Sequence, residues 1–182
     1  MSIRLFLLGL HVPAAVRRRM FQDLTRMTAS AFGVPPPDLA GVPDDALVDG
    51  FAAFTRGLAS GMDADGPEGA AIQARLYDGA RGMGREVRQR LGIRSTSDAR
   101  QALAALYRVL GIEFDADFAR GECTVSRCAF SATYTPDVCR FMSALDAGIV
   151  DGLTGGTTLE FTARLTEGAR QCRARLIGAG QP

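Results

Sequence analysis

Residues 111–128 read GIEFDADFARGECTVSRC, and this stretch decides the class of fold. Apolar residues at positions 112, 114, 116 and 118 alternate with acidic residues at 113, 115 and 117. Alternation with a period of two is typical of a strand that buries one face. A turn at Arg120-Gly121 leads to a second strand, predicted from Cys123 to about Cys128. The second half of the chain therefore begins with an antiparallel hairpin.

The residues before this hairpin have the period of α-helices. Apolar side chains recur at spacings of three and four, most clearly at Ile72, Leu76, Ala80, Met83, Val87 and Leu91. Three glycines, Gly79, Gly82 and Gly84, interrupt this stripe, which suggests close packing or ligand approach. The predicted helices span about residues 13–32, 44–58, 72–91 and 95–110.

The residues after the hairpin predict another helix and a second pair of strands. The helix runs from Pro136 to about Val150, and a Gly-rich loop follows at 153–156. Strands are expected at 158–166 and 170–177, joined by a hairpin turn at Glu167-Gly168. Helices followed by strands indicate an α+β protein whose strand-strand-helix-strand-strand unit forms an antiparallel sheet with helices on one face. We predict one domain, residues 1–182, mainly helical over 1–110 and with the sheet over 111–178.

Composition limits the partners and the compartment. The chain has 182 residues, 47% hydrophobic and 23% charged, and a net charge of +1, which favours neither nucleic acid nor an acidic membrane as a partner. No apolar stretch approaches the length of a membrane span. Six apolar residues after Arg4 are too few for a secretory signal, and we interpret them as a strand or the lead-in to the first helix. Four unevenly spaced cysteines favour the reducing cytoplasm.

The chemistry-bearing residues lie in the last third of the chain. All four cysteines are there, at positions 123, 128, 139 and 172, with Asp146 and Glu160 between the last two. Cys139, Ser143, Asp146 and Val150 share one face of the predicted helix. If this face meets the sheet, a thiol, a hydroxyl and a carboxylate lie in the interior. Alternatively, Cys139 packs as a small apolar residue and Asp146 lies in water.

The strand cysteines differ in their expected orientation. Cys128 lies where its strand gives way to a loop, a usual place for reactive residues, whereas Cys123 would face the opposite side of a regular strand. Cys172 shares the core face of the last strand with Ala174 and Leu176. Side chains alternate between the two faces of a strand, which predicts that Glu160 points outward with Thr162 and Arg164. Only a β-bulge would therefore bring Glu160 to Cys172.

His11 is the only histidine, which leaves little support for a catalytic triad or a histidine-built metal site. A metal would have to bind to thiolates and carboxylates, and such ligands suit zinc. No glycine-rich phosphate-binding motif is present, so nucleotide cofactors are not expected.

The order of short motifs after residue 127 resembles the L-2-amino-thiazoline-4-carboxylic acid hydrolase family. The matching elements are Cys128, Pro136-Asp137-Val138-Cys139, Ala144-Leu145-Asp146, a Gly-rich loop, Thr158-Leu159-Glu160-Phe161 and Leu165-Thr166-Glu167-Gly168-x-x-x-Cys172. Upstream, Phe51-Ala52-Ala53-Phe54-Thr55 also fits. The family usually carries proline directly after the first of these cysteines, where this chain has Ala129. The resemblance implies hydrolysis of a carbon–nitrogen bond.

The same segment more distantly resembles the 4-vinyl reductase-like small-molecule-binding domain. Sensors of that class hold zinc with two cysteines near the final hairpin, a glutamate and a helix cysteine. Three of these positions carry ligands here, Cys139, Glu160 and Cys172, whereas the fourth is Ala163. Zinc would then be lost, or held by three ligands with one position open to water.

Three functions compete on these residues. In a hydrolase of amidine or thiazoline type, Cys128 or Cys139 would attack the substrate, or Asp146 or Glu160 would direct a water molecule. Ser143, Glu160 and Phe130 are the expected substrate-binding residues, and an arginine would bind a substrate carboxylate. The alternatives are a non-catalytic small-molecule-binding domain and a biosynthetic enzyme of different chemistry on the same scaffold. An apolar helix face left uncovered after packing would indicate a homodimer.

Overall fold

A four-stranded antiparallel sheet and five α-helices form the part of the chain that the computed structural model describes, residues 12–178. The predicted α+β class is confirmed, and the helices lie mainly before the sheet. The elements are α2 (Ala14–Phe32), α3 (Leu47–Ala59), α4 (Pro67–Leu91), α5 (Thr96–Val109), β1 (Ile112–Asp117), β2 (Glu122–Cys128), the 3-10 turn η1 (Ala129–Ala132), α6 (Pro136–Thr154), β3 (Thr158–Ala163), the 3-10 turn η2 (Leu165–Glu167) and β4 (Cys172–Ile177).

Helix α6 is the element that carries most of the candidate residues, and local signals define both its ends. The Thr135 hydroxyl accepts a hydrogen bond from the backbone N–H of Val138, and Pro136 occupies the first turn. The helix ends four residues later than predicted, at Thr154, because Gly155 supplies the left-handed conformation (φ 86°) that closes a helix C-terminus.

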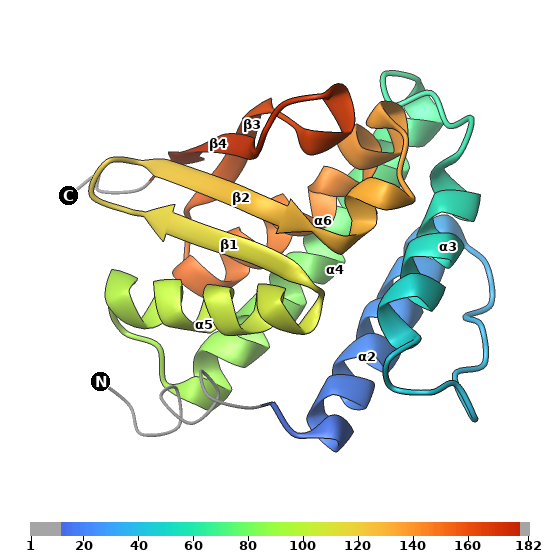
Figure 1. The fold of residues 1–182 in the computed structure, drawn as a ribbon, viewed down its shortest axis with the longest axis horizontal. Helices are drawn as coiled ribbons and strands as arrows, with labels where there is room; N and C mark the ends of the chain where they lie inside the picture. The colour runs from blue at the N-terminus through green and yellow to red at the C-terminus, as the bar shows by residue number, and fades with distance from the viewer. Residues whose placement is uncertain (1–11, 179–182) are drawn as a thin grey trace.

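The sheet has the strand order β1-β2-β4-β3, and every neighbouring pair is antiparallel. Helix α6 connects β2 to the far edge strand β3. In Figure 1 the long helices α4 and α6 lie side by side behind the sheet, α5 runs along its β1 side, and α2 and α3 pack together beyond them. Residues of β1 and β4 alternate between buried and exposed, so one face of the sheet meets the helices and the other meets solvent.

Two β-bulges change which side chains face the helices. In β2, Arg127 pairs with Glu113 and Val125 pairs with Phe114, so Ser126 is the extra residue. In β3, Phe161 pairs with Ala174 and Ala163 pairs with Arg173, so Thr162 is the extra residue. After each bulge, every following side chain lies on the opposite side of the sheet from the one that regular alternation predicts. Both reversals occur next to the chemistry-bearing residues.

Glycines bring α4 and α6 into close contact. A Cβ atom on Gly84 would lie 2.6 Å from the Ile149 carbonyl oxygen, and one on Gly152 would lie 2.1 Å from the Arg81 carbonyl oxygen. Gly148 makes a similar approach to Tyr77. The expectation that the glycines of α4 allow close packing therefore holds for Gly84 and also for Gly79, where a Cβ atom would lie 2.7 Å from Met27 Cγ. It does not hold for Gly82, which has open space around it.

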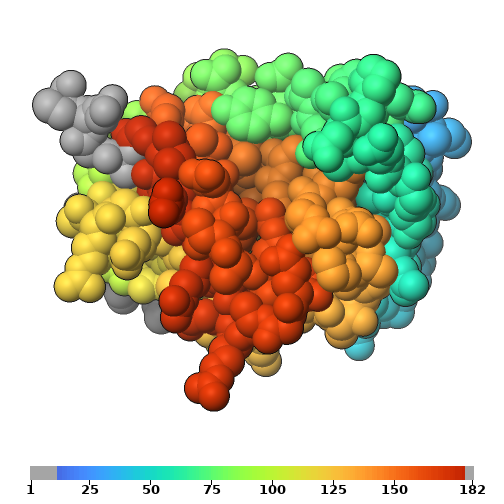
Figure 2. Space-filling view, turned by 90° about the horizontal axis from the view of Figure 1, so that it is seen from above, coloured from blue at the N-terminus to red at the C-terminus, as the bar shows by residue number. Residues whose placement is uncertain are grey.

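Three further observations complete the architecture. Figure 2 shows that β3, η2 and β4, coloured orange to red, lie beside the golden-orange start of α6 on one face of the molecule. His11 and the apolar run at 5–10 lie outside the described residues. No helix within residues 12–178 has both the length and the apolar character required to cross a membrane.

Candidate functional site

A cavity of ≈ 100 Å³ lies where α5, α6 and the start of η1 meet. Its wall is apolar apart from five groups, which are the thiols of Cys128 and Cys139, the hydroxyls of Tyr107 and Tyr134 and the carboxyl group of Asp146. Asp146 is the only acidic or basic side chain among the described residues of this wall. The helix face predicted to carry Cys139 and Asp146 therefore faces inward.

Tyr107 holds the Asp146 carboxyl group in place. The Tyr107 hydroxyl donates a hydrogen bond of 2.9 Å to Asp146 Oδ1, and the Tyr107 ring stacks on Phe114 with 4.4 Å between ring centroids. No other residue within 12–178 donates a hydrogen bond to this carboxyl group. Burial raises the pKa of Asp146 to about 6, although the Tyr107 hydrogen bond and the charge of Arg164 oppose the rise.

The loop after β2 forms the opposite side of the cavity. Phe130, a predicted substrate-binding residue, is buried and packs edge-on against Phe51. The Tyr134 hydroxyl makes a 2.5 Å hydrogen bond with the Thr55 hydroxyl, and Thr55 is fully buried in α3. This side of the cavity is therefore held by aromatic packing and by one hydroxyl pair.

Cys123 and Cys128 lie on the same face of the sheet, contrary to the expectation for a regular strand. The bulge at Ser126 inserts one residue between them and directs both toward the helices. Burial raises the pKa of each thiol to about 12. For Cys128 the backbone N–H groups of Phe130 and Ser131 oppose the rise without cancelling it. Cys128 is therefore a neutral thiol near pH 7, which is a poor nucleophile.

These thiol pKa values predict slow alkylation. Cys123 and Cys128 are expected to stay largely unmodified when the folded protein is treated with iodoacetamide at pH 8, because alkylation requires the thiolate. Peptide mass spectrometry at successive times measures the modification of each cysteine. In urea-unfolded protein, the control, all four cysteines should react. Rapid modification of Cys128 in the folded protein would contradict the assignment of a raised pKa.

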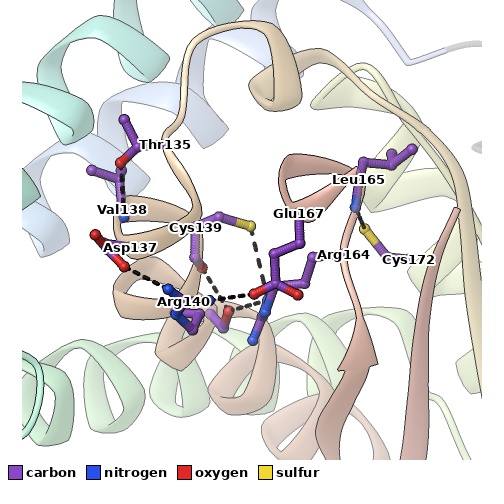
Figure 3. A network of polar contacts seen from close by, with 10 residues as sticks. Thr135, Asp137, Val138, Cys139, Arg140, Arg164, Leu165, Glu167 and Cys172 are labelled. Atoms are coloured by element: carbon purple, nitrogen blue, oxygen red, sulfur yellow. Dashed lines mark hydrogen bonds and ion pairs between the residues drawn. The ribbon is translucent and has the colours of Figure 1, made fainter. Parts of the chain in front are cut away.

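Arg164 does not line the cavity, but it contacts Cys139, which does. Its Nη1 donates a 2.8 Å hydrogen bond to the Ser143 hydroxyl and lies 3.8 Å from Cys139 Sγ (Figure 3), while its guanidinium lies 4.3 Å from the centre of the Phe161 ring. The predicted outward orientation of Arg164 is wrong, because the bulge at Thr162 turns this residue toward α6. Ser143, a predicted substrate-binding residue, thus orients the arginine.

Glu160 does not join Cys139 and Cys172. It precedes the bulge, is exposed and pairs across the strands with Arg175, whereas Cys172 is buried on the helix-covered face. The Cys172 sulfur instead accepts a hydrogen bond from the backbone N–H of Leu165 (Figure 3). Among residues 12–178, no group of three histidine, cysteine, aspartate or glutamate side chains lies close enough to bind a metal ion. Of the two alternatives for zinc, the site with three ligands is therefore wrong. Glu160, expected to bind substrate, does not line the cavity.

Three residues of the site were not predicted. They are Tyr107, Tyr134 and Arg164, which was expected to point outward. A signal for Tyr107 does exist in the sequence, because it lies four residues after Leu103, which is on the buried face of α5. No comparable signal exists for Arg164, because simple alternation assigns it to the solvent face. Its position depends on a bulge that only strand pairing reveals.

The position of Asp146 predicts an unusual dependence of stability on pH. Its pKa is about 6 in the folded protein, above its ordinary value of 3.8, so the fold loses stability as pH rises from about 4 to 6. Asp146→Asn is therefore expected to unfold at higher urea concentration than wild type at pH 7.5 and at nearly the same concentration at pH 4.

The control for this measurement is Asp98→Asn. Hydrogen bonds from Ser95 and Arg94 lower the pKa of the exposed Asp98, so its replacement should reduce stability above pH 4. Urea titrations monitored by circular dichroism at both pH values report the difference. An Asp146→Asn protein that is less stable than wild type at pH 7.5 would contradict the burial argument.

In comparisons with known proteins, no protein-family model and no curated protein matches this chain. The resemblance to hydrolases of amino-thiazoline carboxylic acid remains an expectation from the sequence. Function must therefore be inferred from the cavity and its side chains.

Proposed function

We propose that this protein hydrolyses a carbon–nitrogen bond of amidine type in a small carboxylic acid, with Asp146 as the acid–base group. The observation that carries this proposal is a carboxyl group placed in an otherwise uncharged cavity wall and held by one tyrosine. Its pKa of about 6 suits a group that must accept and return a proton near neutral pH. The resemblance of residues 128–172 to L-2-amino-thiazoline-4-carboxylic acid hydrolases supports the same reaction class.

The proposed reaction adds water across the carbon–nitrogen double bond and then breaks a bond to nitrogen. The ionised Asp146 carboxylate takes a proton from water while the water oxygen bonds to the sp² carbon. The electron pair of the carbon–nitrogen double bond moves to its nitrogen, which takes this proton from Asp146. Asp146 then takes the proton of the new hydroxyl group and gives it to the departing nitrogen, while the carbon–nitrogen bond breaks and the carbon–oxygen double bond forms. Tyr107 keeps the carboxylate oriented through both steps, and the apolar wall limits competition from other water molecules.

Asp146 is a better candidate than Cys128 for the chemical step. With its pKa raised to about 12, the Cys128 thiol needs a base before it can attack, whereas Asp146 is largely ionised at pH 7. Cys139 is the cavity thiol in contact with a cation, Arg164. A covalent version of the mechanism would therefore use Cys139 as the nucleophile, and we keep it as the second form of the proposal.

Arg164 is the proposed binding site for the substrate carboxylate. Its contacts within residues 12–178 are a hydroxyl, a thiol and an aromatic ring, with no carboxylate at ion-pair distance. An oriented guanidinium without an acidic partner can bind a carboxylate through two parallel hydrogen bonds. Ser143 and Phe161 fix its direction, which reduces the entropy lost on binding.

Replacement of Arg164 should weaken substrate binding more than catalysis. Arg164→Gln is expected to raise KM roughly 10- to 100-fold with little change in kcat, which corresponds to the loss of hydrogen bonds to a charged group. Initial rates over a range of substrate concentrations measure both constants. The matched control is Arg140→Gln, because Arg140 is exposed and already paired with Asp137 and Glu167. Equal KM values for the two variants would argue against Arg164.

The test of the proposed function is hydrolysis of L-2-amino-thiazoline-4-carboxylate and of related cyclic and open-chain amidines, followed by mass spectrometry of the products. Ring opening with addition of one water would support it. Binding without turnover would instead favour a non-catalytic small-molecule-binding domain, a function that the mostly apolar cavity wall also suits.

We propose that the protein is cytoplasmic, because all four cysteines are free thiols and such proteins are typical of reducing compartments.

A further inference from the structure

A second hollow lies directly next to the cavity. It has a volume of ≈ 470 Å³ and is bounded by α2, α4 and α5. Met83, Leu106 and Ile149 line both this aliphatic groove, as we call it, and the cavity that holds Asp146. The two spaces are therefore neighbours separated by these three side chains. Met83 is an unbranched, flexible side chain, so a modest rotation could join the two spaces.

The sizes of the two spaces suggest that they serve one ligand. The cavity around Asp146, at ≈ 100 Å³, is well below the roughly 300 to 1,000 Å³ typical of small-molecule sites. The aliphatic groove, at ≈ 470 Å³, falls within that range. A ligand with its reactive group at Asp146 and the rest of its body in the groove would use both spaces.

The lining of the aliphatic groove specifies the chemistry of its occupant. No aromatic side chain is present among the described residues of its wall, which consists largely of Val, Leu, Ile, Met and Ala. The four charged residues that line it pair with each other, Arg19 with Asp23 at 3.2 Å and Arg90 with Glu86 at 3.0 Å. No net charge remains to attract an ionic group, so the wall suits a saturated hydrocarbon chain.

Helix α6 aligns the binding groups with the aliphatic groove. Cys139, which contacts Arg164, lies near its start, Asp146 follows two turns later, and Ile149 is one turn further on. At 1.5 Å per residue, Cys139 and Ile149 are about 15 Å apart along the helix axis. An extended molecule of that length would pass from the guanidinium, across Asp146, to the groove.

We propose that the aliphatic groove binds a hydrocarbon tail of the substrate, so that the preferred substrates are amphipathic carboxylic acids. The inference rests on the proposed function for the position of the carboxylate at Arg164. The tail lies against α2, α4 and α5, and Met83 moves aside to admit it.

The experiment is isothermal titration calorimetry of the full-length protein with saturated carboxylates from octanoate to octadecanoate, a series whose extended chains are shorter and longer than the distance of about 15 Å to the groove. Once the chain reaches the aliphatic groove, each added methylene should lower Kd roughly three- to fourfold, as expected for burial of hydrocarbon. Val16→Trp should abolish this gain for the longer chains, because Val16 lines the groove and is 50% exposed, so a larger side chain can enter the space without disturbing the core.

The matched control is Ser30→Trp, an exposed position on the same helix that does not line the aliphatic groove and should keep the chain-length dependence. A Kd that does not change with chain length, an absence of binding, or equal behaviour of the two tryptophan variants would overturn the proposal. Such results would mean that the groove is closed to ligands, for example by another part of the chain.

Separate variants distinguish failure of this inference from failure of the proposed function. Asp146→Asn should retain the chain-length dependence even where hydrolysis is lost, and Arg164→Gln should weaken all members of the series by a similar factor. If Arg164→Gln has no effect while the chain-length dependence persists, the placement of the carboxylate is wrong and the aliphatic groove stands. If hydrolysis is intact but Kd does not depend on chain length, the proposed function stands and the aliphatic groove does not bind the tail of the substrate.

Discussion

Asp146→Asn should lower kcat/KM for an amidine substrate by about 10²- to 10⁴-fold, the range for removal of a general acid–base group. Asparagine keeps an oxygen that can accept the Tyr107 hydrogen bond, so the geometry of the cavity should survive while proton transfer is lost. In the wild type, kcat/KM should rise with pH through about 6 as the carboxyl group ionises, and the variant should lack this rise. Initial rates between pH 4.5 and 8.5 measure both effects.

Two cysteine variants serve as controls for this result. Cys128→Ser should retain most of the activity, because the half-buried, neutral thiol of Cys128 has no part in the proposed proton transfer. If Asp146→Asn keeps full activity and Cys139→Ser loses it, the covalent mechanism replaces the carboxylate mechanism. Trapping of a Cys139 adduct by rapid acid quench and peptide mass spectrometry would then identify the nucleophile.

Gly152→Ala is expected to destabilise the fold by about 3 kcal/mol, the upper part of the usual range for overpacking. The new Cβ atom would lie 2.1 Å from the Arg81 carbonyl oxygen and 2.9 Å from the Arg85 nitrogen. Both are backbone atoms of α4, so relief requires that the two helices separate. Because Met83 on α4 and Asp146 on α6 line the same cavity, activity should fall with stability. Urea titration monitored by circular dichroism measures the change.

The control is Gly82→Ala on α4 itself. A Cβ atom at Gly82 meets no atom within 4 Å, so alanine should stabilise the helix by up to about 1 kcal/mol through its higher helix propensity. The two substitutions are chemically identical and differ only in what faces the added methyl group. A Gly152→Ala protein that is as stable as the Gly82→Ala protein would show that the helices do not pack closely at this point.

The elements of this protein follow from local sequence. The alternation at 112–117 and the apolar stripe at 72–91 predict a strand and a helix, since each pattern depends on the geometry of one segment alone. Capping hydroxyls begin α5 and α6, and glycines in the left-handed conformation end α2, α4 and α6. The same local geometry placed Cys139 and Asp146 on one helix face, and both line the cavity.

Tertiary structure decided which of these residues meet and in what environment. Strand pairing introduced the bulges at Ser126 and Thr162, which turned Cys128 and Arg164 toward the helices, whereas Glu160, before its bulge, stayed in solvent. A bulge depends on the register with a partner strand, and no local alternation encodes it. The raised pKa of Asp146 likewise requires Tyr107 and the apolar wall around it, which segments distant in sequence supply only once the chain is folded.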